Sequence, residues 1–208
     1  MIKVFFLIFE PGVAWDRIVQ ARRGFLYVLG VQLLPLIVLS TAVEGWSLEH
    51  WGKWQPRFQK YKEFTHGTVL TFEVIQTLLL LAMVLVSALL LLKISQTFHN
   101  RNKYLDAFTT MAYGCSPLFL ARLLDAGPMV NPCAPWILGI MLTVWVLYQG
   151  IPRVMQPDPT HAFGLYLSAI FVVVLTFGMT QLLTGLYLLG YVDYQHSWLT
   201  DKLSGLFR

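Results

Sequence analysis

The chain has 208 residues, of which 56% are hydrophobic and 12% are charged, and its mean hydropathy is +0.60. Soluble domains average roughly 25% charged residues, so a soluble domain of this length would have too much apolar surface to bury. The composition therefore excludes an ordinary soluble enzyme and predicts an integral membrane protein. The formal net charge of +4 favours contact with anionic lipid headgroups, and no nucleic-acid partner is expected.

The first 24 residues are expected to form an N-terminal interfacial segment. "MIKVFFLIF" resembles the start of a signal peptide, but no convincing cleavage site follows it. Pro11 favours the first turn of a helix, and Trp15, Ile18 and Val19 then fall on one side of it. We expect an amphipathic helix lying in the membrane interface. Three arginines here and one further along are expected to contact lipid headgroups: Arg17, Arg22, Arg23 and Arg153.

Residues 25–190 hold five apolar segments with lengths near the roughly 20 residues that cross a bilayer core. They run from Phe25 to Val43, Val69 to Leu92, Tyr104 to Leu124, Pro135 to Gln149 and Ala162 to Leu189. The third is the most polar, so a buried or re-entrant segment is its alternative. The predicted fold is all-α and membrane-integral, a bundle of about five transmembrane helices followed by a short tail at 191–208.

Orientation is weakly specified by the lysines and arginines. With five spans, eight lie on the N-terminal side of the membrane and seven on the other. The basic group before the first span favours a cytoplasmic N-terminus, because basic residues near span ends are retained on that side.

The stretch "YQGIPRVMQPDPTHAFG" is expected to separate the last two spans. Gly150 and Pro152 are typical of residues just after a helix end. Asp158 followed by Pro159 is typical of a helix start. The short link predicts that the two helices are antiparallel neighbours.

The same stretch resembles bacterial members of the Yip (Ypt/Rab-interacting protein) domain family. The resemblance lies in the pattern Tyr-x-Gly-x-Pro-x-x-Met and in Ala-Phe-Gly opening the last helix. Two further stretches fit the family, "DAFTTMAYGCSPLFLARLL" and "EPGVAWDRI". The matched positions include Tyr113, Gly114, Pro117, Tyr148, Gly150, Pro152, Met155, Ala162, Phe163 and Gly164.

The resemblance implies five spans with a cytoplasmic N-terminus. It also implies an inner-membrane protein, since bacterial relatives are of that kind and some are associated with ABC-type exporters. Eukaryotic relatives are linked to Rab-type GTPases and vesicle membranes. This sequence shows no long hydrophilic N-terminal region for docking a GTPase, so the Rab role is not carried over.

Polar side chains inside the predicted spans suggest a polar seam, because intramembrane ionisable groups are costly. Its members are Glu73, Gln76, Asp106, Thr110, Tyr113 and Arg122. One interpretation places the charged members at interfacial depth, hydrated or snorkelling. A second has Glu73 facing Arg122 inside the bundle, and a third is ion or proton translocation.

The fifth span carries a small-residue stripe of Gly164, Ser168, Thr176, Thr180 and Thr184. Such stripes let membrane helices approach closely, so helix packing is expected. A face for a partner subunit, or a substrate path, would have the same pattern.

No catalytic, cofactor or metal site is indicated. The chain has no Gly-x-Ser-x-Gly elbow and no phosphate-binding glycine loop, and its five histidines are scattered. Cys115 and Cys133 are expected to be apolar fillers. The aromatic and basic loop after the first span suggests an interfacial belt, with partner docking as the alternative.

The expected function is therefore non-catalytic: an integral membrane subunit or scaffold that assembles with or regulates a larger complex, possibly a transporter. Its partners would be the lipid bilayer and other membrane subunits or copies of itself. The alternative is a small transporter or lipid-handling protein that uses the polar seam between the second, third and fifth spans.

Overall fold

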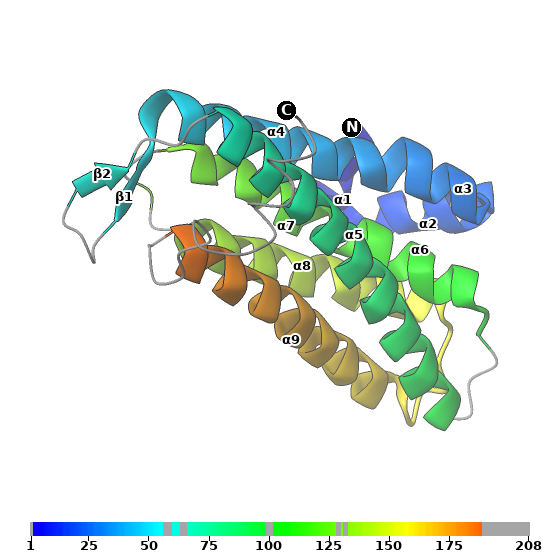
Figure 1. Ribbon diagram of the computed structural model, residues 1–208. Helices are drawn as coiled ribbons and strands as arrows, with labels where there is room; N and C mark the ends of the chain where they lie inside the picture. The colour runs from blue at the N-terminus through cyan, green and yellow to red at the C-terminus, as the bar shows by residue number, and fades with distance from the viewer. Residues whose placement is uncertain are drawn as a thin grey trace, which may run out of the picture.

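The computed structural model describes residues 2–55, 60–62, 66–98, 102–127, 130 and 133–188. The described chain is a helical bundle with one small hairpin (Figure 1). Its elements are α1 (Ile2–Phe9), α2 (Pro11–Ala21), α3 (Phe25–Tyr27), η1 (Val28–Leu33), α4 (Leu34–Trp51), β1 (Lys53–Gln55), β2 (Lys60–Lys62), α5 (His66–Thr97), α6 (Tyr104–Gly114), α7 (Ser116–Ala121), η2 (Arg122–Ala126), α8 (Cys133–Val154) and α9 (Ala162–Leu188). The expected tail at 191–208 lies outside the described residues.

Within the described chain, four helical segments are long and apolar enough to cross a membrane. They are residues 25–51, 66–97, 133–154 and 162–186. The first predicted span continues beyond Val43 to Trp51. The hydropathy pattern stopped at Glu44, but this residue is buried inside the bundle instead of marking its edge.

The third predicted span is broken into α6, α7 and η2, and it forms the centre of the bundle. Pro117 lies just after the break, where its ring would clash with the carbonyl four residues earlier in a continuous helix. Nearly every side chain from Ala107 to Ala121 is buried, with α4, α5 and α8 packed around the segment. Its polarity follows from this position, because it faces protein and not lipid.

The broken segment nevertheless runs alongside the whole first span. At one end, the rings of Tyr104 and Phe25 have centroids 6.1 Å apart. At the other end, Arg122 contacts Glu44. Phe25 and Glu44 are 19 positions apart (25 to 44), or about 28 Å of helix, close to the hydrocarbon thickness. Four continuous helices have the length and composition to cross a membrane, and the fifth crossing stays a prediction.

The first span contains a π-helical stretch, η1, directly before Pro35. Proline lacks a backbone N–H and clashes with the carbonyl four residues before it. A π-helical turn is wider than an α-helical turn, so it accommodates the missing N–H and the proline ring.

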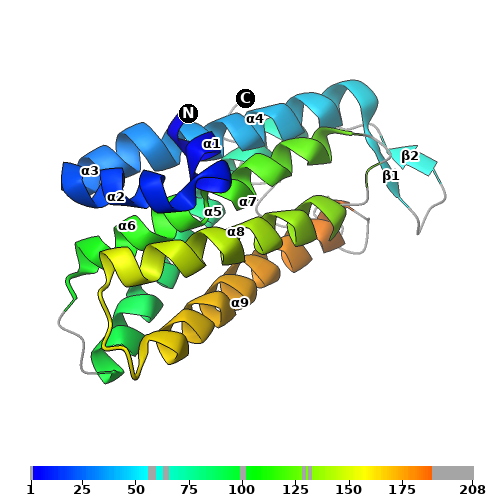
Figure 2. The same ribbon diagram turned by 180° about the vertical axis from the view of Figure 1, so that it is seen from behind.

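The N-terminal helices α1 and α2 pack against the bundle, as seen from behind in Figure 2. The indole Nε1 of Trp15 on α2 donates a hydrogen bond to the Val146 carbonyl on α8 (3.0 Å). A Cβ on Gly150 would lie 2.5 Å from Trp15 Cζ2, so the indole occupies the space that a larger residue would fill. The helix predicted to begin at Pro11 is present as α2. Its location in the membrane interface stays a prediction.

Helix α8 ends later than predicted. Gly150 and Pro152 lie inside it, and the helix continues to Val154. The left-handed residue beyond its end is Gln156, with φ of 42°. Gly150 is thus needed for the contact with Trp15 and not for a helix cap. Helix α9 begins at Ala162, where the last apolar span was expected to begin. The predicted helix start at Asp158 and Pro159 is wrong, because the Asp158 carbonyl accepts from the His161 N–H in a turn that precedes the helix.

The loop after the first span contains an antiparallel hairpin that the sequence analysis did not predict. Lys53 pairs with Lys62, Trp54 with Tyr61 and Gln55 with Lys60. The remainder of the predicted aromatic and basic belt, residues 56–59 and 63–65, lies outside the described residues.

Replacing Gly150 by Ala should lower the free energy of unfolding by about 1–3 kcal/mol, because the new methyl group overlaps the Trp15 ring. Thermal unfolding in mild detergent measures the change. Gly185→Ala is the matched control, since nothing lies within 4 Å of a Cβ there. Equal stability of the two variants would show that Trp15 does not pack on α8 as described.

Cysteine labelling tests whether the third predicted span crosses the membrane. The test does not require knowledge of which side the N-terminus faces. Cys133 is exposed at the start of α8, whereas Cys115 is fully buried. If α6 and α7 cross, Cys133 and a cysteine introduced by Arg22→Cys are labelled by an impermeant maleimide from opposite sides. Labelling of both from one side would mean that the third segment is re-entrant. Cys133→Ser provides the background signal.

Candidate functional site

A buried ionic cluster joins three separate elements near one end of the bundle. Arg122, at the start of η2, donates from Nη2 and Nε to Glu44 Oε2 on α4 at 2.8 and 3.2 Å. Gln76 on α5 donates from Nε2 to the same oxygen at 3.1 Å. Arg122 is 6% exposed, and Glu44 and Gln76 are each 2% exposed. We define Glu44, Gln76 and Arg122 as the buried cluster.

The buried cluster acts as a tie between helices. A buried charge is stable when it is paired and hydrogen-bonded, and removal of one partner typically costs about 3–5 kcal/mol. Glu44 receives three donated hydrogen bonds on one oxygen, from two elements other than its own. The cluster therefore fixes the end of the central segment against α4 and α5.

A second carboxylate, Glu73, lies beside the cluster and has no hydrogen-bond partner among the described residues. Both of its oxygens are buried without a hydrogen bond, and so is Gln76 Oε1, one turn further along α5. Its side chain packs on Gly45, where a Cβ would lie 2.8 Å from Glu73 Cγ.

The predicted polar seam is thus divided. Gln76 and Arg122 meet through Glu44, with Glu73 adjacent. Asp106 and Thr110 make local hydrogen bonds at the start of α6, and Tyr113 packs against Trp15. Asp106 caps α6 by accepting from the Lys103 backbone N–H at 2.9 Å. Thr110 donates to the Asp106 carbonyl at 2.8 Å.

Glu44 was missing from the predicted site. It follows the apolar run at the end of the first span, where an acidic residue usually marks the start of a loop. A signal was available in "STAVEGWS", where Thr41 and Glu44 lie one turn apart on a helix. Thr41 Oγ1 lies 3.0 Å from Thr77 Oγ1 on α5, extending the polar contact between these helices.

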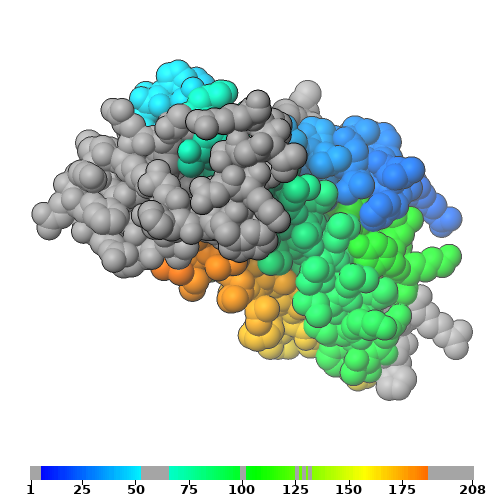
Figure 3. Space-filling model, in the orientation of Figure 1, coloured from blue at the N-terminus to red at the C-terminus, as the bar shows by residue number. Residues whose placement is uncertain are grey.

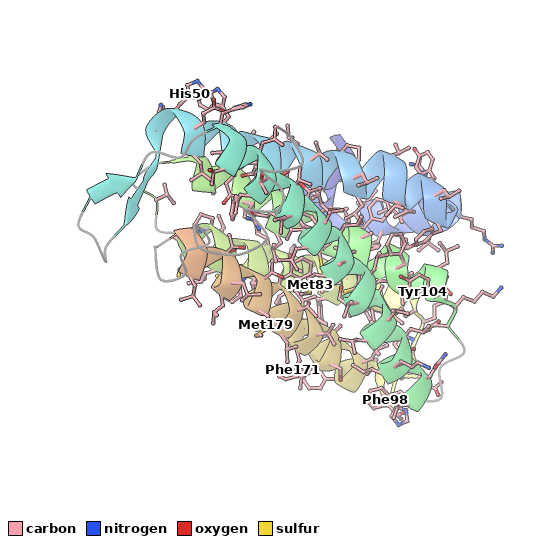
Figure 4. All side chains as sticks on the ribbon, viewed as in Figure 1. His50, Met83, Phe98, Tyr104, Phe171 and Met179 are labelled. Atoms are coloured by element: carbon pink, nitrogen blue, oxygen red, sulfur yellow. The ribbon has the colours of Figure 1, made fainter. Side chains whose placement is uncertain are left out.

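The small-residue stripe of α9 faces the chain's own bundle. Helix α9 lies beside α5 (Figure 3) and also packs on α8. Thr176, Thr180 and Thr184 are buried, and the hydroxyls of Thr176 and Thr180 donate to carbonyls of their own helix. The opposite face carries large apolar side chains such as Phe171 and Met179 (Figure 4). That outer face, and not the stripe, is available to lipid or a partner.

The four arginines predicted at headgroups have different surroundings. Arg17 and Arg22 are exposed. The Arg23 guanidinium lies 4.2 Å above the Tyr27 ring. Arg153 donates to Asp16 at 3.0 Å and to the Gln149 carbonyl at 2.8 Å, so it connects α8 to α2.

Several of the motif residues converge on Trp15. Its ring meets Tyr113 edge-on, with centroids 6.2 Å apart, and it covers Gly150. Gly114 lies against the Leu147 side chain, leaving no room for a Cβ. Met155, just past the end of α8, is also buried in the core. Three distant sequence motifs therefore form one packing contact.

No three His, Cys, Asp or Glu side chains gather in the described chain closely enough to hold a metal ion. A cavity of about 10 Å³ touches Arg122 and Trp136, which is space for about one water molecule.

Long apolar helices surrounding a buried ionic cluster define a multi-pass helical membrane protein. The model of the Yip1 domain family matches residues 5–180. This range covers most of the chain and all three converging motifs, so the protein belongs to the Yip1 domain family. Comparisons with curated proteins and with solved structures gave no match.

The same substitution on the two adjacent carboxylates should have different effects. Glu44→Gln removes the charge that Arg122 needs and should cost about 3 kcal/mol of unfolding free energy. Glu73→Gln removes a charge that has no partner among the described residues and should cost much less. Thermal unfolding in detergent measures both. Equal losses would contradict the assignment of Glu44 as the arginine's partner.

Proposed function

We propose that this protein is a non-catalytic integral membrane subunit or scaffold, which assembles with or regulates a larger membrane complex. The observation that carries the proposal is that the buried charged side chains of the helical bundle pair with one another. Arg122 and Glu44 satisfy one another and join helices of the same chain. A polar group engaged in this way supports a structural role more than a catalytic one.

The outer surface supports an assembly role. Helices α8 and α9 present exposed aromatic side chains, including Trp145, Tyr148, Phe163 and Phe171. Exposed aromatic residues are enriched in the central contacts of protein interfaces. The partner is another membrane subunit or a second copy of the chain. We place the protein in the inner membrane because of its resemblance to bacterial family members. The basic residues before the first span favour a cytoplasmic N-terminus.

The test is purification of the tagged protein from its own host in a gentle detergent, with mass spectrometry of what co-purifies. We expect a stoichiometric partner, or a defined multiple of the chain's own mass. Replacing Trp145 and Phe171 with Ala should release it, whereas Thr180→Ser, on the buried face, should not. A protein that purifies alone and monodisperse in several detergents would contradict the proposal.

One observation favours transport as a second function. The Glu73 carboxylate and Gln76 Oε1 are buried without partners, and unpaired intramembrane groups are functional candidates. In liposomes, Glu73→Gln should then abolish flux of the substrate. Asp106→Asn should leave flux unchanged, since Asp106 caps a helix end. Intact flux in the Glu73 variant would remove the basis for this function.

A further inference from the structure

A cavity of about 70 Å³ lies between the N-terminal helices and the central segment. Its lining residues are Phe6, Ala14, Arg17, Ile18, Ala21, Arg23 and Tyr113. This volume accommodates about five water molecules, comparable to a phosphate group. The cavity is separate from the buried cluster, which joins α4, α5 and η2.

The charge of the lining is entirely positive. Arg17 and Arg23 contribute two guanidinium groups, and no carboxylate is among the lining residues. The nearby Asp16 is paired with Arg153 at 3.0 Å, so it does not neutralise them. The ring of Tyr27, 4.2 Å from Arg23, supports that guanidinium through a cation–π contact. Such a cavity attracts an anion.

Two of the four arginines predicted to contact lipid headgroups line this cavity, and the other two do not. Arg22 lies outside the lining, at the left-handed residue that ends α2 (φ of 38°). Arg153 is occupied by Asp16 and Gln149. Arg17 and Arg23 therefore line the same cavity, whereas Arg22 is exposed outside it.

The remaining walls are apolar and partly open to the surroundings. Phe6 is half-exposed, and Phe9 and Val13 on the same two N-terminal helices are also exposed. An anion with hydrocarbon attached would cover this surface, whereas a free inorganic ion would not. Guanidinium groups bind phosphate oxygens in a bidentate geometry. We propose that this cavity binds the phosphate group of an anionic phospholipid, held by Arg17 and Arg23.

Native mass spectrometry of the detergent-solubilised protein, titrated with phosphatidylglycerol, measures the affinity. Arg17→Gln and Arg23→Gln should each weaken binding about tenfold, because each removes a hydrogen bond to a charged group. Arg22→Gln is the matched control, with the same loss of charge one position from Arg23, and should change binding less than twofold. Thermal unfolding of each variant verifies that it is folded.

The proposal would be overturned by equal weakening by Arg22→Gln, by unchanged binding in both cavity variants, or by equally tight binding of phosphatidylcholine. A parallel titration with inorganic phosphate distinguishes the source of the anion. We expect inorganic phosphate to compete poorly. Displacement of the lipid at equal concentration would show that the site takes free phosphate, and that the lipid chains add nothing.

Discussion

The fold depends on one buried ion pair, between Glu44 on the first span and Arg122 at the end of the central segment. A broken, polar segment has too little apolar surface to be held in a bilayer by hydropathy. The pair compensates, because an arginine in a low-dielectric interior is stable only beside an opposite charge. Gln76 brings α5 into the same contact. Helices α4 and α5 are thus tied to the end of a segment that would be poorly suited to face lipid.

A second contact, at the other end of the bundle, holds the N-terminal helices. Trp15 enters the space above Gly150 and donates to Val146, while Tyr113 packs against its ring. The three motifs of the Yip1 domain that are far apart in sequence are neighbours here. Packing against one another accounts for the positions of Trp15, Tyr113 and Gly150 in these motifs. The positive cavity lies beside this contact, since Tyr113 borders both.

Much of the fold could be predicted from the sequence because lipid imposes simple rules on length and hydropathy. The four continuous helices and the start of α9 followed from those rules. The end of α8 was not predicted, because Gly150 and Pro152 are residues typical of a helix end. Both lie inside the helix, where the absence of a side chain at Gly150 leaves room for the Trp15 ring. Pattern alone does not show which distant side chain will occupy a position.

The candidate site was predicted in part. Arg122 and Gln76 were found because polar groups within apolar runs are conspicuous, and Glu44 was missed because it lies where such a run ends. Its burial depends on a partner 78 positions away, which no local pattern contains. The role of the small-residue stripe was open for the same reason, since a face buried within the chain and a face buried against a partner have the same composition.

The most direct measurement is a charge exchange at the buried pair. Glu44→Arg and Arg122→Glu should each give aggregated or strongly destabilised protein by size-exclusion chromatography and thermal unfolding, because each leaves like charges buried together. The double variant should recover much of the yield and stability, with Gln76 turning its unpaired Oε1 toward the new arginine. A double variant no better than either single variant would contradict the view that this pair holds the central segment in place.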